Sequence, residues 1–211
     1  MSAERSSVRV VFFGAAGVGK TALIQRFLAG TFEAQHRRTV EELHCLDYEL
    51  GRQRPPLRLE IMDTSGSYSF PAMRRLGIRR GDAFALVYSL QEPESFQEVR
   101  RLRDEILEAK GRQPCPPILL VGNKSDLAPA GADPRLHLDW GDPHLEASAK
   151  LGDNVPALFR QLLLLLHLPG RLSPVLRHRR RRRTFPESSS SSSAQPSGTP
   201  AIRKSHSCTV S

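Results

Sequence analysis

The clearest chemical pattern in the chain is GAAGVGKT at 14–21, which fits G-x-x-x-x-G-K-T. An apolar stretch at 8–13 before it predicts a β-strand, and apolar residues at helical spacing follow it at 22–28. A loop of small residues between a strand and a helix lets backbone N–H groups surround phosphate oxygens. In this pattern Lys20 reaches the terminal phosphates and the Thr21 hydroxyl ligates Mg²⁺. The alternative is a Gly-rich turn that binds nothing.

A second polar group, DTSG at 63–66, follows the strand pattern at 57–62. An Asp at the end of a strand suits a second contact to Mg²⁺ by Asp63, and the Gly66 N–H suits a γ-phosphate. D-x-x-G alone occurs in many turns. It gains weight here because it comes one predicted hairpin after the phosphate loop.

A third group, NKSD at 123–126, follows a buried-strand pattern at 118–122. The Asp126 carboxylate can accept hydrogen bonds from the ring N1–H and the exocyclic amine of guanine, whereas adenine offers neither donor there. Such a polar mismatch discriminates strongly between bases. Lys124 would lie over the base or brace the phosphate loop. The alternative for N-K-x-D is a solvated helix start, which a preceding buried strand disfavours.

Strand and helix patterns alternate along the chain around these groups. Near-continuous or alternating apolar runs predict strands, and stripes at helical spacing predict helices. The expected strands are 8–13, 44–50, 57–62, 83–90, 118–122 and the start of 145–150. The first expected helix follows the phosphate loop and ends at about Ala29, two others span 93–110 and 154–167, and a loop with a short helix is expected at 67–80. The pattern predicts an α/β, three-layer P-loop nucleotide-binding fold with a mostly parallel sheet and one antiparallel edge strand. Between 127 and 143 any helix is expected to be short or irregular.

The net charge of +9 is concentrated in the tail at 169–211. That tail has nine Lys and Arg against one Glu, whereas 1–168 has twenty-two against twenty-one Asp and Glu. Nucleic-acid binding calls for a basic face on the fold, so an RNA-binding function would rest on the tail alone, and we expect no nucleic-acid partner. The cysteines Cys45, Cys115 and Cys208 have no metal or disulfide spacing, which fits a reducing compartment. No signal peptide or membrane-spanning run is predicted.

The tail is predicted to be disordered because few apolar residues remain in it. Its last four residues, CTVS, fit a C-a-a-X box whose terminal Ser favours farnesylation of Cys208, although Thr209 is polar for its position. A farnesyl group and the basic run Arg177–Arg183 would together attach the chain to an anionic membrane. The alternatives are a free terminal cysteine and an Arg run that serves as a nuclear address or RNA patch. Phosphorylation of Ser205 or Ser207 would weaken such attachment.

Over residues 8–168 the chain resembles the Ras family of small GTPases. The resemblance is carried by GAAGVGKT at 14–21, Thr39, DTSG at 63–66, NKSD at 123–126 and ASAK at 147–150. Within that family, DTSGSYSFPAMRRLGI at 63–78 is most similar to the Rhes/Dexras and Ras-dva-like branch. The resemblance implies a G domain over 1–168 that binds GTP or GDP with Mg²⁺ and acts as a monomer.

The resemblance also implies a set of site residues. Phe32 would pack on the guanine edge, and Thr39 would reach Mg²⁺ through its side chain and the γ-phosphate through its N–H. Ser148 and Ala149 would shape the base pocket, with the Ala149 N–H meeting the guanine oxygen. The implied metal ligands are Thr21, Thr39 and Asp63, and the implied nucleotide-binding residues are Gly14, Ala15, Ala16, Gly17, Val18, Gly19, Lys20, Thr21, Ala22, Phe32, Thr39, Asp63, Gly66, Asn123, Lys124, Asp126, Leu127, Ser148, Ala149 and Lys150.

A family member of this kind would be a switch at the cytoplasmic face of the plasma membrane. GTP would order the loops at 31–42 and 64–76 through Thr39 and Gly66, and loss of the γ-phosphate would release them. The expected partners are effector proteins, an exchange factor and an activating protein. The effector loop implied by the resemblance comprises Arg38, Thr39, Val40, Glu41 and Glu42.

Three departures from the family pattern bear on hydrolysis and fold. The implied catalytic residues are Lys20, Thr39, Gly66 and Ser67, and Ser67 stands where the family usually has a Gln that orients the attacking water. Ala16 stands where many members have Gly, and its methyl group would crowd an arginine finger. Both predict slow GTP hydrolysis and a GTP-biased resting state. The segment between NKSD and ASAK is shorter than in Ras, which concerns the fourth helix and not the site.

Two further functions share parts of this pattern. A constitutively GTP-bound binding module, regulated by its level, would make every nucleotide contact without hydrolysis. A P-loop phosphotransferase that uses ATP would share the phosphate loop, but Asp126 argues against it.

Overall fold

The computed structural model describes residues 7–35, 39–48, 57–66, 71–111, 113–127 and 140–168, and the backbone of 179–181. Several predictions fall outside these residues. They concern the effector-loop residue Arg38, the catalytic candidate Ser67, the irregular helix expected within 127–143, the C-terminal box at Cys208, and the serines of the tail.

Strands and helices alternate as the sequence predicts. In chain order they are β1 (Ser7–Phe13), α1 (Lys20–Ala29), β2 (Glu42–Tyr48), β3 (Leu57–Asp63), α2 (Pro71–Arg80), β4 (Ala83–Ser89), α3 (Ser95–Lys110), β5 (Ile118–Asn123), the 3₁₀ turn η1 (Ser125–Leu127), β6 (His144–Glu146), α4 (Val155–Leu165) and β7 (Arg179–Arg181). None of the described helices is both long and apolar enough to cross a membrane.

The sheet has the strand order β6-β5-β4-β1-β3-β2-β7. β2 runs antiparallel to both of its neighbours, and the other pairings are parallel, so the prediction of a mostly parallel sheet with one antiparallel strand is confirmed. β7 differs from the expectation, because we predicted no element in the tail and placed the antiparallel strand at the very edge. The outer edge of β2 carries backbone groups that a further strand can satisfy, and β7 does so.

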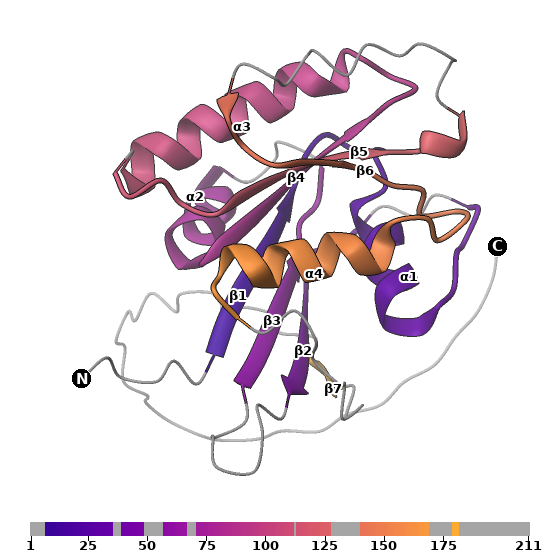
Figure 1. Cartoon of the computed structure of the whole chain (residues 1–211), viewed down its shortest axis with the longest axis horizontal. Coiled ribbons are helices and arrows are strands. Elements are labelled where there is room, and N and C mark those ends of the chain that lie inside the picture. The colour runs from indigo at the N-terminus through magenta and orange to yellow at the C-terminus, as the bar shows by residue number, and fades with distance from the viewer. Residues whose placement is uncertain are drawn as a thin grey trace, which may run out of the picture.

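The helices form a layer on each face of the sheet, with α2 and α3 on one side and α1 and α4 on the other (Figure 1). This confirms the three-layer arrangement. The apolar stripe predicted for α3 is buried against β4 and β5, and the stripe predicted for α4 is buried with α1 on the opposite face. The Phe27 and Phe159 rings stack with their centroids 3.6 Å apart and join α1 to α4. All seven residues of β4 are buried, as expected for a parallel strand covered on both faces.

Candidate functional site

The three polar motifs lie at one edge of the sheet because each follows a strand of the same direction. β1 pairs in parallel with β3 and β4, and β4 pairs in parallel with β5. The phosphate loop follows β1, DTSG begins at the last residue of β3, and NKSD begins at the last residue of β5. The carboxyl ends of parallel strands form the usual ligand crevice of such sheets.

The start of α1 has the features of an anion site. Gly19 caps the helix in a left-handed conformation (φ 96°), no side chain caps the first-turn N–H groups, and the first turn contains no acidic residue. The free N–H groups and the helix dipole therefore favour a negative ligand. At the other end of the loop, a Cβ on Gly14 would lie 2.0 Å from the Val87 carbonyl oxygen, so only glycine fits against β4.

Lys20 lies inside this loop. Its side chain is buried, and Nζ donates to the Gly14 and Ala15 carbonyl oxygens at 2.9 and 2.8 Å. Burial lowers the pKa of Lys20 to about 8, although the Asp63 carboxylate acts in the opposite direction. A charged ammonium held at this depth is electrostatically under-compensated, so an anion in the loop would stabilise it.

Two hydroxyl groups and a carboxylate meet beside Lys20. Thr21 Oγ1 lies 2.7 Å from Thr39 Oγ1, so the loop that holds Thr39 is closed over the start of α1. Asp63 is 1% exposed, and neither of its oxygens has a hydrogen-bond partner of good geometry among the described residues. Burial raises the pKa of Asp63 to about 6, although the nearby Thr21 hydroxyl and Lys20 ammonium lower it.

These three groups fit Mg²⁺. Hydroxyl and carboxylate oxygens are hard ligands, and an under-compensated buried carboxylate is stabilised by a cation. Among the described residues, no three His, Cys, Asp or Glu side chains gather into a metal-binding cluster. A magnesium ion here would therefore share its coordination with phosphate and water oxygens, as Mg²⁺ does in nucleotide sites.

Gly66 of DTSG lies directly against the phosphate loop. A Cβ on Gly66 would lie 2.3 Å from both the backbone N and the Cα of Ala16. The segment after β3 therefore packs against the phosphate loop at Ala16. The buried Thr64 hydroxyl donates to the Phe12 carbonyl oxygen at 2.6 Å, which fixes this segment to the end of β1.

Asn123 joins the phosphate loop to the ASAK segment. Its Nδ2 donates to the Val18 carbonyl oxygen at 2.8 Å, and its Oδ1 accepts from the Ala149 N–H at 3.1 Å. Asn123 thus holds the two ends of the site at a fixed separation. The contact of the Ala149 N–H with a guanine oxygen stays a prediction, since this N–H donates to Asn123 in the structure.

Asp126 has one engaged oxygen and one available oxygen. Oδ1 accepts from Ser148 Oγ at 2.7 Å, and Ser148 Oγ accepts from the Leu151 N–H at 3.0 Å, so the carboxylate is held in one orientation. Oδ2 is buried and has no hydrogen-bond donor among the described residues; Lys150 Nζ is 3.7 Å away. A buried acceptor without a donor suits a ligand with N–H groups.

The remaining predicted site residues lie on or next to α1 and η1. The ring of Phe32 is exposed after the end of α1, Ala22 lies in the first turn of α1, and Leu127 is exposed at the end of η1. Lys124 has a positive φ of 66°, and its Nζ pairs with the Glu92 carboxylate at 3.1 Å. That pairing was not among the two positions expected for the Lys124 side chain.

Sequence reasoning missed Arg26. Its Nε donates to the Ala149 carbonyl oxygen at 2.9 Å, and its other guanidinium nitrogens donate to the Gly30 and Lys150 carbonyl oxygens. Arg26 therefore ties the ASAK segment to α1. The sequence contains no signal for this contact, because residues 26 and 149 are joined only by the fold.

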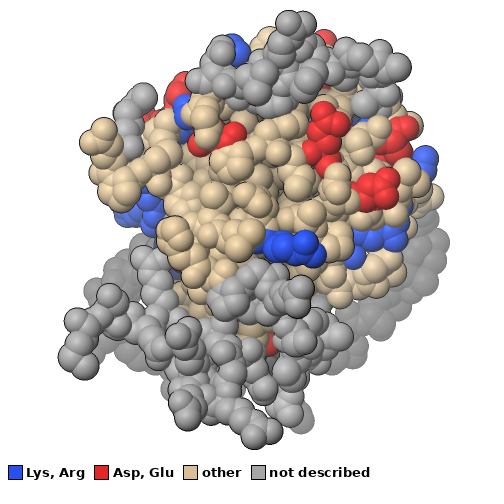
Figure 2. Space-filling view, viewed as in Figure 1, with Lys and Arg blue, Asp and Glu red and all other residues tan. Residues whose placement is uncertain are grey.

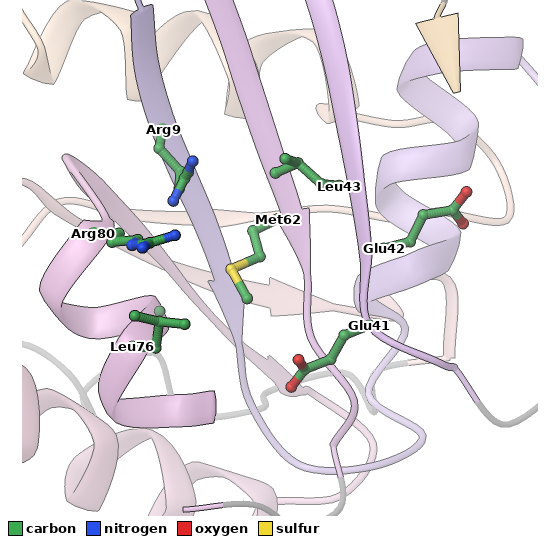
Figure 3. A pocket seen from close by; sticks show the side chains of 8 residues that line it. Arg9, Glu41, Glu42, Leu43, Met62, Leu76 and Arg80 are labelled. Carbon is green, nitrogen blue, oxygen red and sulfur yellow. The ribbon is translucent and has the colours of Figure 1, made fainter. Parts of the chain in front are cut away.

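The described part of the predicted effector loop lies beside a pocket. Val40 is 85% exposed, and Glu41 and Glu42 are half-buried. Figure 3 shows Glu41 and Met62 pointing toward α2, whereas the Glu42 carboxylate points to the other side of β2. The residues that line the pocket are Arg9, Glu41, Glu42, Leu43, Met62, Leu76, Gly77 and Arg80.

The fold and the site define a P-loop nucleotide-binding protein. The sequence profile of the Ras family matches residues 9–167. The GTP-binding protein Rhes of Mus musculus is 39% identical over 83% of this chain and 70% of its own length, and Di-Ras2 of Macaca fascicularis is 40% identical over 77% and 83%. Human Rhes is 38% identical over 83% of this chain and 70% of its own length. The chain belongs to the Ras family of small GTPases.

Proposed function

We propose that this chain is a magnesium-dependent guanine-nucleotide switch with slow intrinsic GTP hydrolysis that acts at a membrane. The observation that best supports the guanine site is the buried, oriented Asp126 carboxylate with one oxygen left without a donor. Guanine supplies two N–H donors on one edge, and adenine supplies none at those positions.

The phosphate end supports the magnesium and switch parts of the proposal. Thr21, Thr39 and Asp63 would hold Mg²⁺, which supplies charge neutralisation at the terminal phosphates. Thr39, from the loop at 31–42, contacts Thr21, and Gly66, from the segment after β3, lies against Ala16, so both predicted switch loops contact the phosphate loop at 14–21. A ligand that contacts both loops favours their closed arrangement, and its loss favours their release.

In hydrolysis, the chain's own side chains and N–H groups would hold the phosphates in position and neutralise the charge that develops on them. Lys20 would exchange its carbonyl partners for phosphate oxygens and offset the charge that develops during in-line attack by water. The Gly66 N–H would donate to the γ-phosphate. Ser67 would be too short to orient the water as a Gln does, and the exposed Ala16 methyl group would crowd a partner's arginine. The Ser67 departure supports slow intrinsic hydrolysis, and the Ala16 departure supports a weak response to an activating protein.

Membrane attachment rests on the tail sequence. A farnesyl group on Cys208 gives only marginal binding, and the basic run Arg177–Arg183 would add attraction to anionic lipid. On the face of the molecule in Figure 2, Lys and Arg are interspersed with Asp and Glu, and no continuous basic surface is seen. Residues 1–168 carry twenty-two Lys and Arg against twenty-one Asp and Glu, and the tail carries nine against one, so the charge distribution favours a tail that binds lipid over a fold that binds RNA.

The nucleotide proposal is tested by equilibrium competition. Purified full-length protein, stripped with a chelator and returned to Mg²⁺, should bind GTP and GDP and should be displaced by ATP only at a large excess. Equal affinity for the two triphosphates would reject the guanine assignment, and binding that is independent of Mg²⁺ would reject the metal assignment.

The membrane proposal has its own test. Wild-type protein expressed in a prenylating cell should partition with membranes, and Cys208→Ser should move to the soluble fraction. Cys115→Ser is the matched control, because Cys115 is an exposed cysteine that lies outside the tail. Identical partitioning of the three proteins would reject lipid attachment at Cys208.

The constitutively GTP-bound module remains a second candidate, since it makes the same contacts. It predicts that copurified nucleotide is GTP and that no activating protein accelerates hydrolysis. The departures at Ala16 and Ser67 favour it to the extent that they slow turnover.

A further inference from the structure

The three described residues of the tail, 179–181, lie at the outer edge of β2. β2 uses its inner edge for β3 over all seven residues, Glu42–Tyr48. Its outer edge pairs antiparallel with β7, with Leu43 opposite Arg181, His44 opposite Arg180 and Cys45 opposite Arg179. Figure 1 shows β7 lying beside β2 at the side of the sheet away from β3.

The strand that occupies this edge belongs to the basic run. Residues 179–181 are the first three of five consecutive arginines, in a tail that carries nine Lys and Arg against one Glu. The same residues were assigned above to anionic membrane. One segment cannot donate its backbone hydrogen bonds to β2 and lie extended on a lipid surface at the same time, so the two positions exclude one another.

The paired stretch also begins where the effector loop ends. Leu43 follows Glu42 directly, and β7 points toward the Glu42 end of β2 because the pairing is antiparallel. Glu41 lies one residue further on, is half-buried, and has no cationic partner among the described residues. A basic strand at this edge therefore approaches acidic groups of the loop that would contact effectors.

We propose that the outer edge of β2 is a docking surface for an extended strand, that the chain's own segment 179–181 covers it, and that anionic membrane competes for that segment. This inference rests on the membrane attachment proposed above. An open strand edge is a template for a partner strand. Covered, the edge is closed to an effector that would add a strand; when the tail lies on the membrane, the edge is open beside the effector loop.

Segment 179–181 can move between β2 and the membrane because the stretch that pairs with β2 is short. A three-residue ladder contributes few hydrogen bonds, and the attraction of each basic residue to an anionic surface is local and screened by salt. Anionic lipid can therefore displace the segment without unfolding the sheet. The protein would expose its β2 edge at the membrane and cover it elsewhere.

Hydrogen exchange of the full-length, Mg·GDP-loaded protein tests the pairing. A variant with both Arg180→Pro and Arg181→Pro removes two successive backbone donors of β7, one of which faces β2 because successive N–H groups of an antiparallel strand alternate in direction. The variant with both Arg180→Gln and Arg181→Gln is the matched control, because it removes the same charges and keeps both donors. We expect the peptide at 42–48 to exchange roughly three- to tenfold faster in the Pro variant than in wild type, with the Gln variant unchanged. Equal exchange in all three proteins would overturn the pairing.

The competition is tested with the same peptide and two kinds of vesicle. Phosphatidylcholine vesicles that contain phosphatidylserine should raise the exchange of 42–48 in wild type to the rate of the Pro variant, and pure phosphatidylcholine vesicles should not. Protein that sediments with the anionic vesicles while 42–48 stays protected would overturn the competition and leave membrane attachment intact. Protein that does not sediment with them would overturn both, and the Pro and Gln variants would still decide the pairing.

A second copy of the chain is the other occupant to be distinguished. Light scattering at the same protein concentration should give a monomer for wild type. A wild-type dimer whose 42–48 peptide is protected only at dimer-forming concentrations would replace the intramolecular pairing by pairing between two copies.

Discussion

The guanidinium of Arg26 donates to the Ala149 carbonyl oxygen at 2.9 Å across two elements that are far apart in the chain. α1 begins at the phosphate loop, and Ala149 belongs to the segment predicted to meet the base. The two ends of the nucleotide site are therefore held together by a side chain that would touch neither phosphate nor guanine. Arg26 is a positioning residue.

Removing the Arg26 side chain should weaken nucleotide binding. Arg26→Ala leaves three backbone carbonyl oxygens without this donor, and we expect GDP to dissociate roughly tenfold faster, equivalent to about 1.4 kcal/mol. The measurement is release of a fluorescent GDP analogue. Arg101→Ala is the matched control, because Arg101 is an exposed arginine on α3 that pairs with Glu98. Unchanged dissociation in Arg26→Ala would show that Asn123 alone holds the segment.

Exchanging the Asp126 carboxylate for an amide should change which base is bound. In Asp126→Asn the group hydrogen-bonded to Ser148 can no longer accept from two guanine donors, whereas its NH₂ can donate to the carbonyl oxygen that xanthine has in place of the amine. We expect affinity for GTP to fall roughly 100-fold or more and affinity for xanthosine triphosphate to rise. Competition binding measures both. Asp153→Asn, on an exposed loop, is the control. A parallel loss of both nucleotides would indicate a damaged site and not an exchanged specificity.

Introducing a long amide side chain at position 67 should raise the rate of GTP hydrolysis if Ser67 limits that rate. In Ser67→Gln the side chain can reach and orient water, so single-turnover GTP hydrolysis should be faster than in wild type at equal GTP affinity. Ala16→Gly is the companion variant: it should leave intrinsic hydrolysis near wild type and increase only the response to an activating protein. Fast hydrolysis in wild type with no gain from Gln would contradict the proposed cause.

The placement of the three motifs at one edge of the sheet was predictable from sequence, because each motif directly follows a strand pattern. The phosphate loop, DTSG and NKSD each follow an apolar strand, and parallel pairing brings their ends together without further information. Buried stripes on α3 and α4 were predictable because helical spacing records which side chains face the sheet.

What sequence could not provide were contacts that depend on the assembled fold. Nothing near Arg26 indicates Ala149, and nothing near Lys124 indicates the ion pair with Glu92, because both contacts join segments that are distant in the chain. β7 was missed for a different reason. Its residues have no strand pattern, and the open edge of β2 supplies the pairing.

Replacing the Asp63 carboxylate by an amide should stabilise the nucleotide-free protein and destabilise the protein that holds Mg²⁺ and GTP. Burial raises the pKa of Asp63 to about 6, and this shift is net of the favourable Lys20 charge. A carboxyl whose folded-state pKa is raised weakens the fold progressively as pH rises from about 4 to 6, and the loss is complete above that range. Nucleotide-free Asp63→Asn should therefore be more stable than wild type at pH 7.5, by about 1–3 kcal/mol, and the difference should shrink at pH 5. With Mg²⁺ and GTP present the order should reverse, because an amide holds a cation less tightly than a carboxylate.

Urea denaturation at the two pH values, with and without ligand, measures all four stabilities. A nucleotide-free variant less stable than wild type at pH 7.5 would mean that the carboxylate is already compensated inside the protein, and the assignment of Asp63 to Mg²⁺ would lose its main physical support.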